Sequence, residues 1–266
     1  MSKEPTVCIM EVTPQLAENW IIYNIENNRH LNNKTVELLK NILLSGKGKL
    51  TNDAISFNIN GMLVNGQHRL WAIIESGVTL KCIIQKNLPL DSMDCLDQGK
   101  RRTNDDNFKI QGKNYPKDCA ATVRCILNSL SSHRATVYSH SEIADFMEKY
   151  HESVQYAHEN LPKGIFKSSA FRAVMTRAHI LKKPLEKLTR FCTVLMTGLN
   201  TPEDGAALLL RNKILENNNK MNNRRNQRDY YTWTETALAH YLNNRTPGRL
   251  LPAKEEMFPI TGVDNE

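Results

Sequence analysis

The sequence predicts an α+β fold in which a mixed N-terminal domain, residues 1–110, is followed by an all-helical domain, residues 111–266. Strand-like and helix-like runs alternate up to Gln85, whereas beyond Asp105 apolar residues recur only at helical spacing. The charge also differs, because residues 1–110 hold 13 Lys/Arg against 12 Asp/Glu and residues 111–266 hold 22 against 16, or +1 and +6. With 266 residues, 40% of them hydrophobic, the chain can bury a core in each of two domains.

The first expected elements are one strand and two helices. A run of mostly apolar residues predicts a strand over residues 7–12. Thr13-Pro14 is typical of an N-cap followed by a first-turn proline, which predicts a helix through Trp20. We expect Asn33 to cap the next helix, whose apolar residues share one face up to Gly46.

A hairpin and a strand–helix–strand segment come next. Asn60-Gly61 is typical of a tight hairpin and predicts strands at residues 54–59 and 62–64. The residues Asn65-Gly66-Gln67-His68-Arg69-Leu70 then join a strand to an apolar helix, and a last strand covers residues 80–85.

The second half is expected to form a helical bundle, since its apolar residues recur at helical spacing with turn residues between the runs. The expected helices cover residues 118–130, 142–150, 169–181, 185–196, 202–215 and 231–242. Residues 217–228 are polar and are expected to form a solvated loop. Residues 252–266 are expected to form an extended strap that docks through Met257-Phe258-Pro259.

The strand-to-helix junction combines the parts of an anion-binding site. The first N–H groups of a helix lack internal partners and carry the positive end of the helix dipole. Gly66 lets a ligand approach closely, while His68 and Arg69 add hydrogen-bond donors. Asn65 and Gln67 complete this candidate phosphate site. The alternative is a structural helix start, at which Gln67 and His68 satisfy buried backbone groups.

A second candidate cluster lies at residues 97–105. Three consecutive cations beside a flexible glycine can grip a polyphosphate, with Arg101 and Arg102 providing bidentate contacts. Asp97 is a candidate to orient an arginine or to bind Mg²⁺. A solvated charged loop is the alternative. Asn28-Arg29-His30-Leu31 is a third polar cluster, for which ordinary helix capping is the alternative.

The basic second half favours DNA or another polyanion as partner. The candidate DNA contacts are Arg224, Arg225 and Arg228, which precede aromatic residues at positions 230, 231 and 233. Such a run offers phosphate contacts beside stacking surfaces. The alternative is a solvated loop whose neighbouring aromatic residues pack in the core.

Several other classes of protein are not indicated. The six cysteines form no CxxC pair, so we expect reduced thiols rather than a disulfide scaffold or a zinc site. The spacing of His140, His151 and His158 indicates no metal set, and the motifs GxGxxG, GxxxxGK[ST], HExxH and GxSxG do not occur. The sequence shows no apolar run of membrane-spanning length and no N-terminal signal pattern, which predicts a soluble cytoplasmic protein.

The three N-terminal clusters, in this order, resemble the ParB/sulfiredoxin-like superfamily, most closely the ParB-like proteins of phages and mobile elements with a D/N-GQHRL box. The matching positions are Asn28 to Leu31, Ile55 to Phe57, Gly61 to Leu70, Ala72, Ser76-Gly77, Asp97 to Arg102 and Asp105. The resemblance covers roughly residues 7–110. It implies that the box binds nucleotide phosphates. Branches of the superfamily hydrolyse CTP, transfer phosphoryl groups from ATP, repair sulfinic acids or are reported nucleases, so the fold does not choose the function.

The box departs from the well-studied branches. Sulfiredoxins have a cysteine where this chain has Gln67, so sulfinic-acid repair is not expected. Chromosome-partitioning proteins have a glutamate-arginine-arginine box where this chain has Gln67-His68-Arg69, so CTP specificity is not implied. Gly66, His68 and Arg69 match the histidine-bearing box of the serine kinases, but the sequence indicates no pocket for a substrate serine.

The leading hypothesis is a phage or mobile-element ParB-like protein that binds a nucleoside triphosphate of unspecified base at the box, and DNA through its helical half. An NTPase or phosphotransferase activity would rest on positioning and charge neutralisation. The expected roles are phosphate binding by Gly66 and Gln67, charge stabilisation by Arg69 and Arg102, proton transfer by His68 and Mg²⁺ binding by Asp97.

Two alternatives belong to other classes. One is a non-enzymatic DNA-binding or partner-blocking protein whose phosphate site contacts a DNA backbone phosphate. The other is a ParB-like DNA nuclease, which requires a carboxylate cluster on Mg²⁺ that the sequence does not clearly assemble. The oligomeric state is left open.

Overall fold

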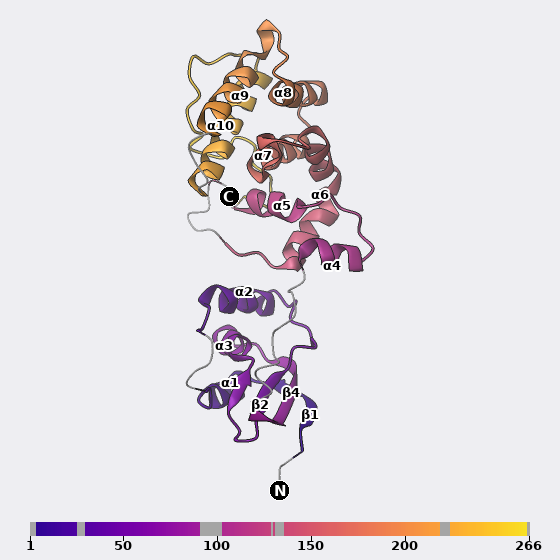
Figure 1. The fold of residues 1–266 in the computed structure, drawn as a ribbon, viewed down its shortest axis with the longest axis vertical. Helices are drawn as coiled ribbons and strands as arrows, with labels where there is room; N and C mark the ends of the chain where they lie inside the picture. The colour runs from indigo at the N-terminus through magenta and orange to yellow at the C-terminus, as the bar shows by residue number, and fades with distance from the viewer. Residues whose placement is uncertain are drawn as a thin grey trace. The chain divides into compact units, whose positions relative to one another are not determined.

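The chain divides into two compact units, Met1–Arg101 and Arg102–Glu266 (Figure 1). Each unit has its own hydrophobic core. The computed structural model describes residues 4–25, 30–90, 103–128, 130, 136–218 and 224–264. The fold is α+β, with the sheet in the first unit. The residue pattern predicts that the first domain ends after residue 110, whereas helix α4, Asn104–Ile110, belongs to the second unit.

The first unit is a four-stranded sheet with three helices packed on it (Figure 1). Its strands are β1 Thr6–Val12, β2 Ile55–Asn58, β3 Leu63–Asn65 and β4 Leu80–Leu88, and its helices are α1 Pro14–Ile21, α2 Asn33–Leu44 and α3 Gln67–Ser76. The strand order is β1-β4-β2-β3, in which β4 runs antiparallel to β1 and parallel to β2. Strands β2 and β3 form the expected hairpin. The predicted elements of this unit are therefore present, with small shifts at their ends.

One face of this sheet is covered by the helices. Val12, Ile55, Cys82 and Ile84 on the strands share a core with Ala17, Val36, Leu70 and Ile73 on the helices. Helix α3 packs against both α1 and α2, so it is the central helix of the layer. The start of α3 is consequently held in place by the strand before it and by the helices on either side.

The helix starts mostly follow the sequence signals. Thr13 caps α1, because its hydroxyl accepts a hydrogen bond from the Leu16 N–H at 3.2 Å, and Pro14 is the first helical residue. The prediction that Asn33 caps α2 is wrong by one residue. Asn32 is the cap, and its side-chain oxygen accepts from the N–H groups of Lys34 and Thr35. Two consecutive asparagines offer equal capping chemistry, so residue type alone cannot choose between them.

The described residues of the second unit form helices and no strand. The α-helices are α4 Asn104–Ile110, α5 Cys119–Leu127, α6 His140–Asn160, α7 Ser169–Ile180, α8 Leu185–Thr197, α9 Gly205–Asn218 and α10 Arg224–Leu242. Two short 3₁₀ helices are η2 Ile165–Lys167 and η3 Pro202–Asp204. The all-helical prediction is confirmed for these residues. None of the described helices is long and apolar enough to cross a membrane.

Helix α7 lies at the centre of the second unit. Residues 170–178 are buried without interruption, and α7 packs against α5, α6, α8 and α10. A helix that is buried on all sides needs small or apolar residues throughout, and alanine recurs along α7 for that reason. Arg172 and Arg177 are the charged exceptions among its buried residues.

The prediction of a solvated loop at residues 217–228 is wrong at both ends, which are helical, and residues 219–223 lie outside the described part of the chain. Helix α9 continues to Asn218, and α10 begins at Arg224. A segment of asparagine, arginine and glutamine has no apolar residues at helical spacing, so its sequence does not identify a helix. Once a helix has formed, however, its extension through such residues costs little free energy. The buried side chains that begin at Tyr230 supply the packing that α10 needs.

The C-terminal strap docks on the helical unit, but Met257, which was expected to face the core, points outward. Phe258 and Ile260 are each 3% exposed, whereas Met257 is 46% exposed. The strap is joined to α10 by a backbone hydrogen bond of 3.3 Å from Ala253 to Thr232. Docking through Phe258 is therefore confirmed, and docking through Met257 is wrong.

Candidate functional site

The candidate phosphate site lies at the junction of β3 and α3, as predicted. Asn65 ends β3, Gly66 is the N-cap of α3 with φ of 105°, and Gln67 is the first helical residue. A Cβ atom on Gly66 would lie 3.0 Å from Cγ1 and 3.1 Å from Cα of Ile55. The position thus requires glycine for its backbone conformation and for its packing on β2. The cap provides no side-chain hydrogen bond to the first turn of α3.

The side chains of Asn65 and Gln67 form hydrogen bonds within the first unit. Gln67 is 4% exposed, and its Oε1 accepts from Asn24 Nδ2 at 3.2 Å. Asn65 Nδ2 donates to the Ala54 carbonyl oxygen at 3.1 Å. These bonds tie the junction to the segments that follow α1 and precede β2. They give the two side chains a structural role, although the Gln67 bond is to the side chain of Asn24 and not to a buried backbone group as the alternative expects.

His68 connects the junction to the start of α2. Its Nε2 accepts a hydrogen bond of 3.0 Å from the backbone N–H of Asn32, the N-cap of that helix. Nε2 must be unprotonated to accept this bond. The interaction explains how the box helps to fix the first turn of α2.

Arg69 is the side chain of the box with the most readily exchanged partner. It donates from Nη1 to the Asp53 carbonyl oxygen and lies 3.4 Å from the Asp53 carboxylate through Nη2. The Arg69 side chain is 17% exposed and that of Asp53 is 72% exposed. The Asp53 carboxylate is open to solvent, so it is the partner of Arg69 that a phosphate oxygen could replace, whereas the hydrogen bond to the Asp53 carbonyl oxygen would remain.

The other predicted parts of this site lie outside the described residues. They are Asp97, Arg101 and Arg102 of the second cluster and Asn28 and Arg29 of the third. Their approach to Arg69 therefore stays a prediction. Within the described residues, no group of three or more His, Cys, Asp or Glu side chains is arranged to hold a metal ion.

The candidate DNA residues lie at the start of α10 and not in a loop. Arg228 is exposed, while the side chains of Arg224 and Arg225 lie outside the described part of the chain. Tyr230 and Tyr231 are 6% and 4% exposed, so both pack in the core and cannot stack on bases. This outcome corresponds to the alternative in which the aromatic residues face inward.

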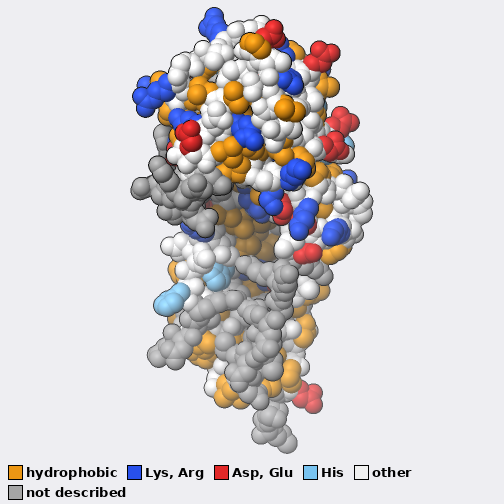
Figure 2. All heavy atoms as spheres, turned by 45° about the horizontal axis from the view of Figure 1, so that its top comes forward, with side chains coloured by type: hydrophobic (Ala, Val, Ile, Leu, Met, Phe, Trp, Pro, Cys, Tyr) orange, Lys and Arg blue, Asp and Glu red, His pale blue; other side chains and the backbone are white. Residues whose placement is uncertain are grey.

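The cations of the helical unit are not confined to α10. Figure 2 shows Lys and Arg side chains spread over the visible face of this unit, with Asp and Glu between them. Lys213 on α9 places Nζ 4.1 Å from the centre of the Trp233 ring and donates to the Leu250 carbonyl oxygen at 2.8 Å. Trp233 thus pairs with a cation of its own unit.

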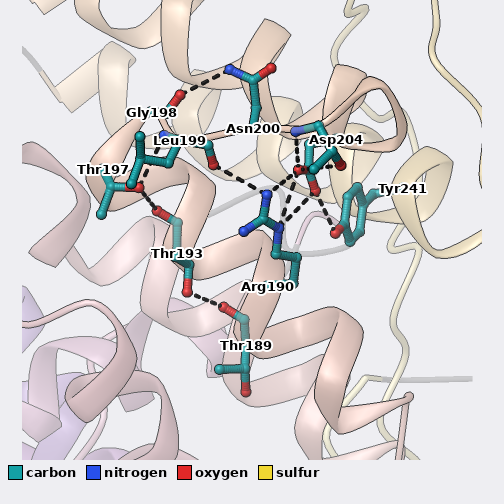
Figure 3. A network of polar contacts seen from close by, with 10 residues as sticks. Thr189, Arg190, Thr193, Thr197, Gly198, Leu199, Asn200, Asp204 and Tyr241 are labelled. Atoms are coloured by element: carbon teal, nitrogen blue, oxygen red, sulfur yellow. Dashed lines mark hydrogen bonds and ion pairs between the residues drawn. The ribbon is translucent and has the colours of Figure 1, made fainter.

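A polar network around Asp204 was not predicted from the sequence (Figure 3). Arg190 Nη2 lies 2.6 Å from Asp204 Oδ2, and the hydroxyl of Tyr241 donates to Oδ1 at 3.0 Å. Burial raises the pKa of Asp204, but hydrogen bonds from Arg190 and Thr201 outweigh burial and lower the pKa to about 2. The network joins α8 and α10 to η3. Its sequence signal is the capping box formed by Thr201 and Asp204.

A second unpredicted cluster holds the C-terminal strap. Arg177 on α7 is fully buried and donates to the two carboxylate oxygens of Asp264 at 2.6 and 2.9 Å. It also donates to the carbonyl oxygens of Ile126 at 2.6 Å and Phe258 at 3.2 Å. One guanidinium therefore connects α7, the end of α5 and the strap.

Two carboxyl groups meet beside Arg177. Glu235 on α10 is fully buried, and Glu256 on the strap is its acidic neighbour. Tyr231 donates from its hydroxyl to both oxygens of Glu256, at 2.8 and 2.9 Å. Burial and the neighbouring Glu256 raise the pKa of Glu235 far above its ordinary range. Two adjacent carboxyl groups in a dry site are stable when they share a proton.

The structure shows the surroundings of two of the named histidines and of the described cysteines. His158 is buried and within 3.1 Å of Thr122 Oγ1, and burial lowers its pKa to about 4. His140 Nδ1 lies 2.9 Å from Asn104 Oδ1. Both histidines thus have structural partners. The cysteines among the described residues are free thiols: Cys8 is exposed, Cys125 is half-buried, and Cys82, Cys119 and Cys192 are buried.

Comparison of the chain with protein-family models, with curated proteins and with solved structures finds no match. The resemblance to ParB-like proteins therefore rests on the sequence positions that carry it.

Proposed function

We propose that this chain is a phage or mobile-element ParB-like protein that binds a nucleoside triphosphate at the GQHR loop and DNA through its helical unit. The observation that carries the nucleotide half is the start of α3, where a left-handed glycine cap without a side chain is followed by an arginine in the first turn. A helix N-terminus attracts anions, and a guanidinium in its first turn adds a charge-assisted contact. The exposed Asp53 carboxylate is the partner of Arg69 that a phosphate oxygen could replace.

Turnover of the nucleotide, as an NTPase or phosphotransferase, places further demands on the box. His68 already accepts a hydrogen bond from the Asn32 N–H, so proton transfer by His68 requires that this bond opens. Arg101 and Arg102 would complete the phosphate site, and Asp97 would supply the carboxylate for Mg²⁺. Nucleotide binding would thus depend on Arg69 and the start of α3, and turnover on these additional residues.

A non-enzymatic DNA-binding protein is the second candidate, and the hydrogen bonds of the box favour it. Asn65, Gln67, His68 and Arg69 all bond to other segments of the first unit, and the exposed Asp53 carboxylate beside Arg69 is the partner that a phosphate could replace. One arginine at a helix start suits a DNA backbone phosphate as well as a nucleotide. Thermal stabilisation by ATP, CTP, GTP or UTP, with and without Mg²⁺, separates the candidates, because a ligand that binds only the native state raises its apparent stability.

Replacing Arg69 with alanine is expected to weaken binding of the stabilising nucleotide roughly ten- to a hundred-fold, the size of one charge-assisted contact. Arg69→Lys should restore little, because an ammonium lacks the planar fork. Asp53→Asn should strengthen binding, since it removes the competing carboxylate. Isothermal titration measures all three affinities. Lys40→Ala is the matched control, because Lys40 also forms an exposed ion pair in this unit, at 3.4 Å from Glu75.

Equal affinity in the wild type and in Arg69→Ala would assign Arg69 to the structure. The non-enzymatic candidate would be favoured by two results together. None of the four nucleotides would stabilise the chain, and binding of duplex DNA would be lost in Arg69→Ala.

The DNA half of the proposal predicts the behaviour of the triple variant Arg224→Ala, Arg225→Ala, Arg228→Ala. Its binding to duplex DNA should weaken for all sequences alike, because phosphate contacts carry no sequence information. The slope of log affinity against log salt should become shallower by about 0.9 for each lost phosphate contact. Fluorescence anisotropy over a salt series measures this slope, and nucleotide affinity should be unchanged.

A control triple variant removes the same charge elsewhere in the helical unit. Lys163, Lys167 and Lys182 are all exposed and lie away from α10 in sequence. Their replacement by alanine should preserve most of the slope. If both triple variants change it equally, DNA binding depends on the total charge of the unit and not on the start of α10.

A further inference from the structure

Strand β1 is an edge strand, and no described strand pairs with its outer side. The order β1-β4-β2-β3 places it at the end of the sheet, and β4 is its only partner among the described strands. Its register with β4 is continuous over all seven residues from Thr6 to Val12, without a bulge. Every second residue of an edge strand directs its backbone N–H and C=O groups away from the sheet. These groups are a template for pairing with another strand.

Apart from Glu11, strand β1 lacks the features that usually protect an edge. It contains no lysine and no proline, and its first four residues are exposed. Val7 and Ile9 are 66% and 54% exposed on the face opposite to the helices. Ile9 lies opposite the half-buried Ile83 of β4, so an apolar strip runs across both strands towards the edge.

We propose that a second copy of this chain pairs antiparallel with β1 about a two-fold axis, with Cys8 of one copy opposite Cys8 of the other. In this register Val7 of each copy faces Ile9 of the other, so the two exposed apolar side chains meet twice. The pairing is isologous, since the same strand serves both copies. The pairing joins the two sheets at their β1 edges into one continuous sheet.

The side-chain pattern of β1 selects this register. A shift of two residues in one direction sets Val7 against Glu11, and a shift of two in the other sets Ile9 against Pro5. A shift of one residue turns the helix-covered face of one sheet to the opposite side, because side chains alternate with a period of two. In the proposed register Glu11 faces Pro5 of the second copy, so no like charges are directly opposed.

Sedimentation equilibrium of the full chain, from micromolar to submillimolar concentration, is the primary test. We expect a monomer–dimer equilibrium whose dissociation constant rises about tenfold in Ile9→Lys, because the substitution enters the symmetric interface twice. Val7→Lys should act in the same way. Leu199→Lys is the control, since Leu199 is a 71% exposed leucine in the helical unit.

Cross-linking with a short bismaleimide tests the register. Cys95 lies outside the described residues, so the measurement uses a Cys95→Ser background. The cross-linked dimer should form there and disappear when Cys8→Ser is added. A chain that stays monomeric throughout, a dimer that Ile9→Lys does not weaken, or a cross-link that survives Cys8→Ser would overturn the proposal. None of these results bears on nucleotide or DNA binding.

Discussion

Replacing Arg177 with methionine should destabilise the helical unit by about 3–5 kcal/mol, the cost of removing one partner from a buried ion pair. The Arg177 guanidinium is fully buried and forms a bidentate pair with Asp264. Methionine fills part of the space but removes the donor to the Ile126 carbonyl oxygen and the positive charge beside two carboxylates. The strap loses its central attachment at the same time.

Urea unfolding followed by circular dichroism measures this effect. Arg124→Met is the matched control, because Arg124 is exposed on α5 and its replacement should change stability by no more than about 0.5 kcal/mol. Asp264→Asn breaks the same pair from the other side, so the double variant should be more stable than the sum of the single effects predicts. A loss below about 1 kcal/mol in Arg177→Met, set against the magnitude for buried pairs, would show that the strap does not depend on this pair.

The elements that the sequence predicts well carry local signals. Thr13-Pro14 marks the start of α1, and Asn60-Gly61 marks the turn between β2 and β3. Each signal acts within a few residues, so its chemistry can be interpreted without knowledge of the rest of the fold. Apolar periodicity identifies the longer helices of the second unit for the same reason.

Helix α4 was not predicted because its signals are short and mostly polar. It begins with a capping box in which Thr103 and Asp106 exchange hydrogen bonds. Its one buried residue, Phe108, packs its ring 5.0 Å from that of Tyr115 and 4.9 Å from that of His140. A single buried aromatic gives no apolar period, so only the capping box was available as a signal.

The place of the candidate site was predictable, but the partners of its side chains were not. Gln67 bonds to Asn24 and His68 to Asn32, residues 43 and 36 positions away. Asparagine beside a helix is common, and nothing in its local sequence identifies a distant acceptor. Arg177 and Asp264, 87 positions apart, are the extreme case. Such pairs are set by the packing of helices, which residue patterns specify only in part.

Glu235 should make the helical unit lose stability as the pH rises, and Glu235→Gln should remove that loss. The carboxyl is fully buried, its Oε1 has no hydrogen-bond donor among the described residues, and Glu256 lies beside it. Burial and Glu256 raise the pKa of Glu235, so the folded chain keeps a proton that the unfolded chain releases near pH 4.3.

The direction of the effect follows from proton linkage. Because the pKa of Glu235 is higher in the folded chain than in the unfolded chain, its contribution to stability is complete below the unfolded pKa. This contribution is lost as the pH rises towards the folded pKa. Between those limits the free energy of unfolding should fall by up to about 1.4 kcal/mol per pH unit. Four further groups contact this site or lie in its field: Arg177, Tyr231, Asp264 and Cys125. Burial raises the pKa of Tyr231 and of Cys125, so both groups stay protonated in the folded chain up to pH 9. On unfolding the Cys125 thiol titrates near its reference value of about 8.5, equally in the wild type and in Glu235→Gln, so the difference between the two slopes belongs to Glu235.

Glutamine at position 235 reproduces the protonated carboxyl. Its amide can donate to Glu256 and its oxygen can accept from the Met257 N–H, as Glu235 Oε2 does at 3.4 Å. The free energy of unfolding, measured with urea at several pH values between 6 and 9, should therefore fall less steeply with pH in Glu235→Gln than in the wild type. The difference in slope corresponds to at most one proton. At the alkaline end the variant should be more stable than the wild type. Glu216→Gln, at an exposed position on α9, should keep the wild-type slope. A variant that keeps that slope and is destabilised at high pH would mean that Glu235 is ionised beside Arg177, and that the strap is held by charge pairing rather than by a shared proton.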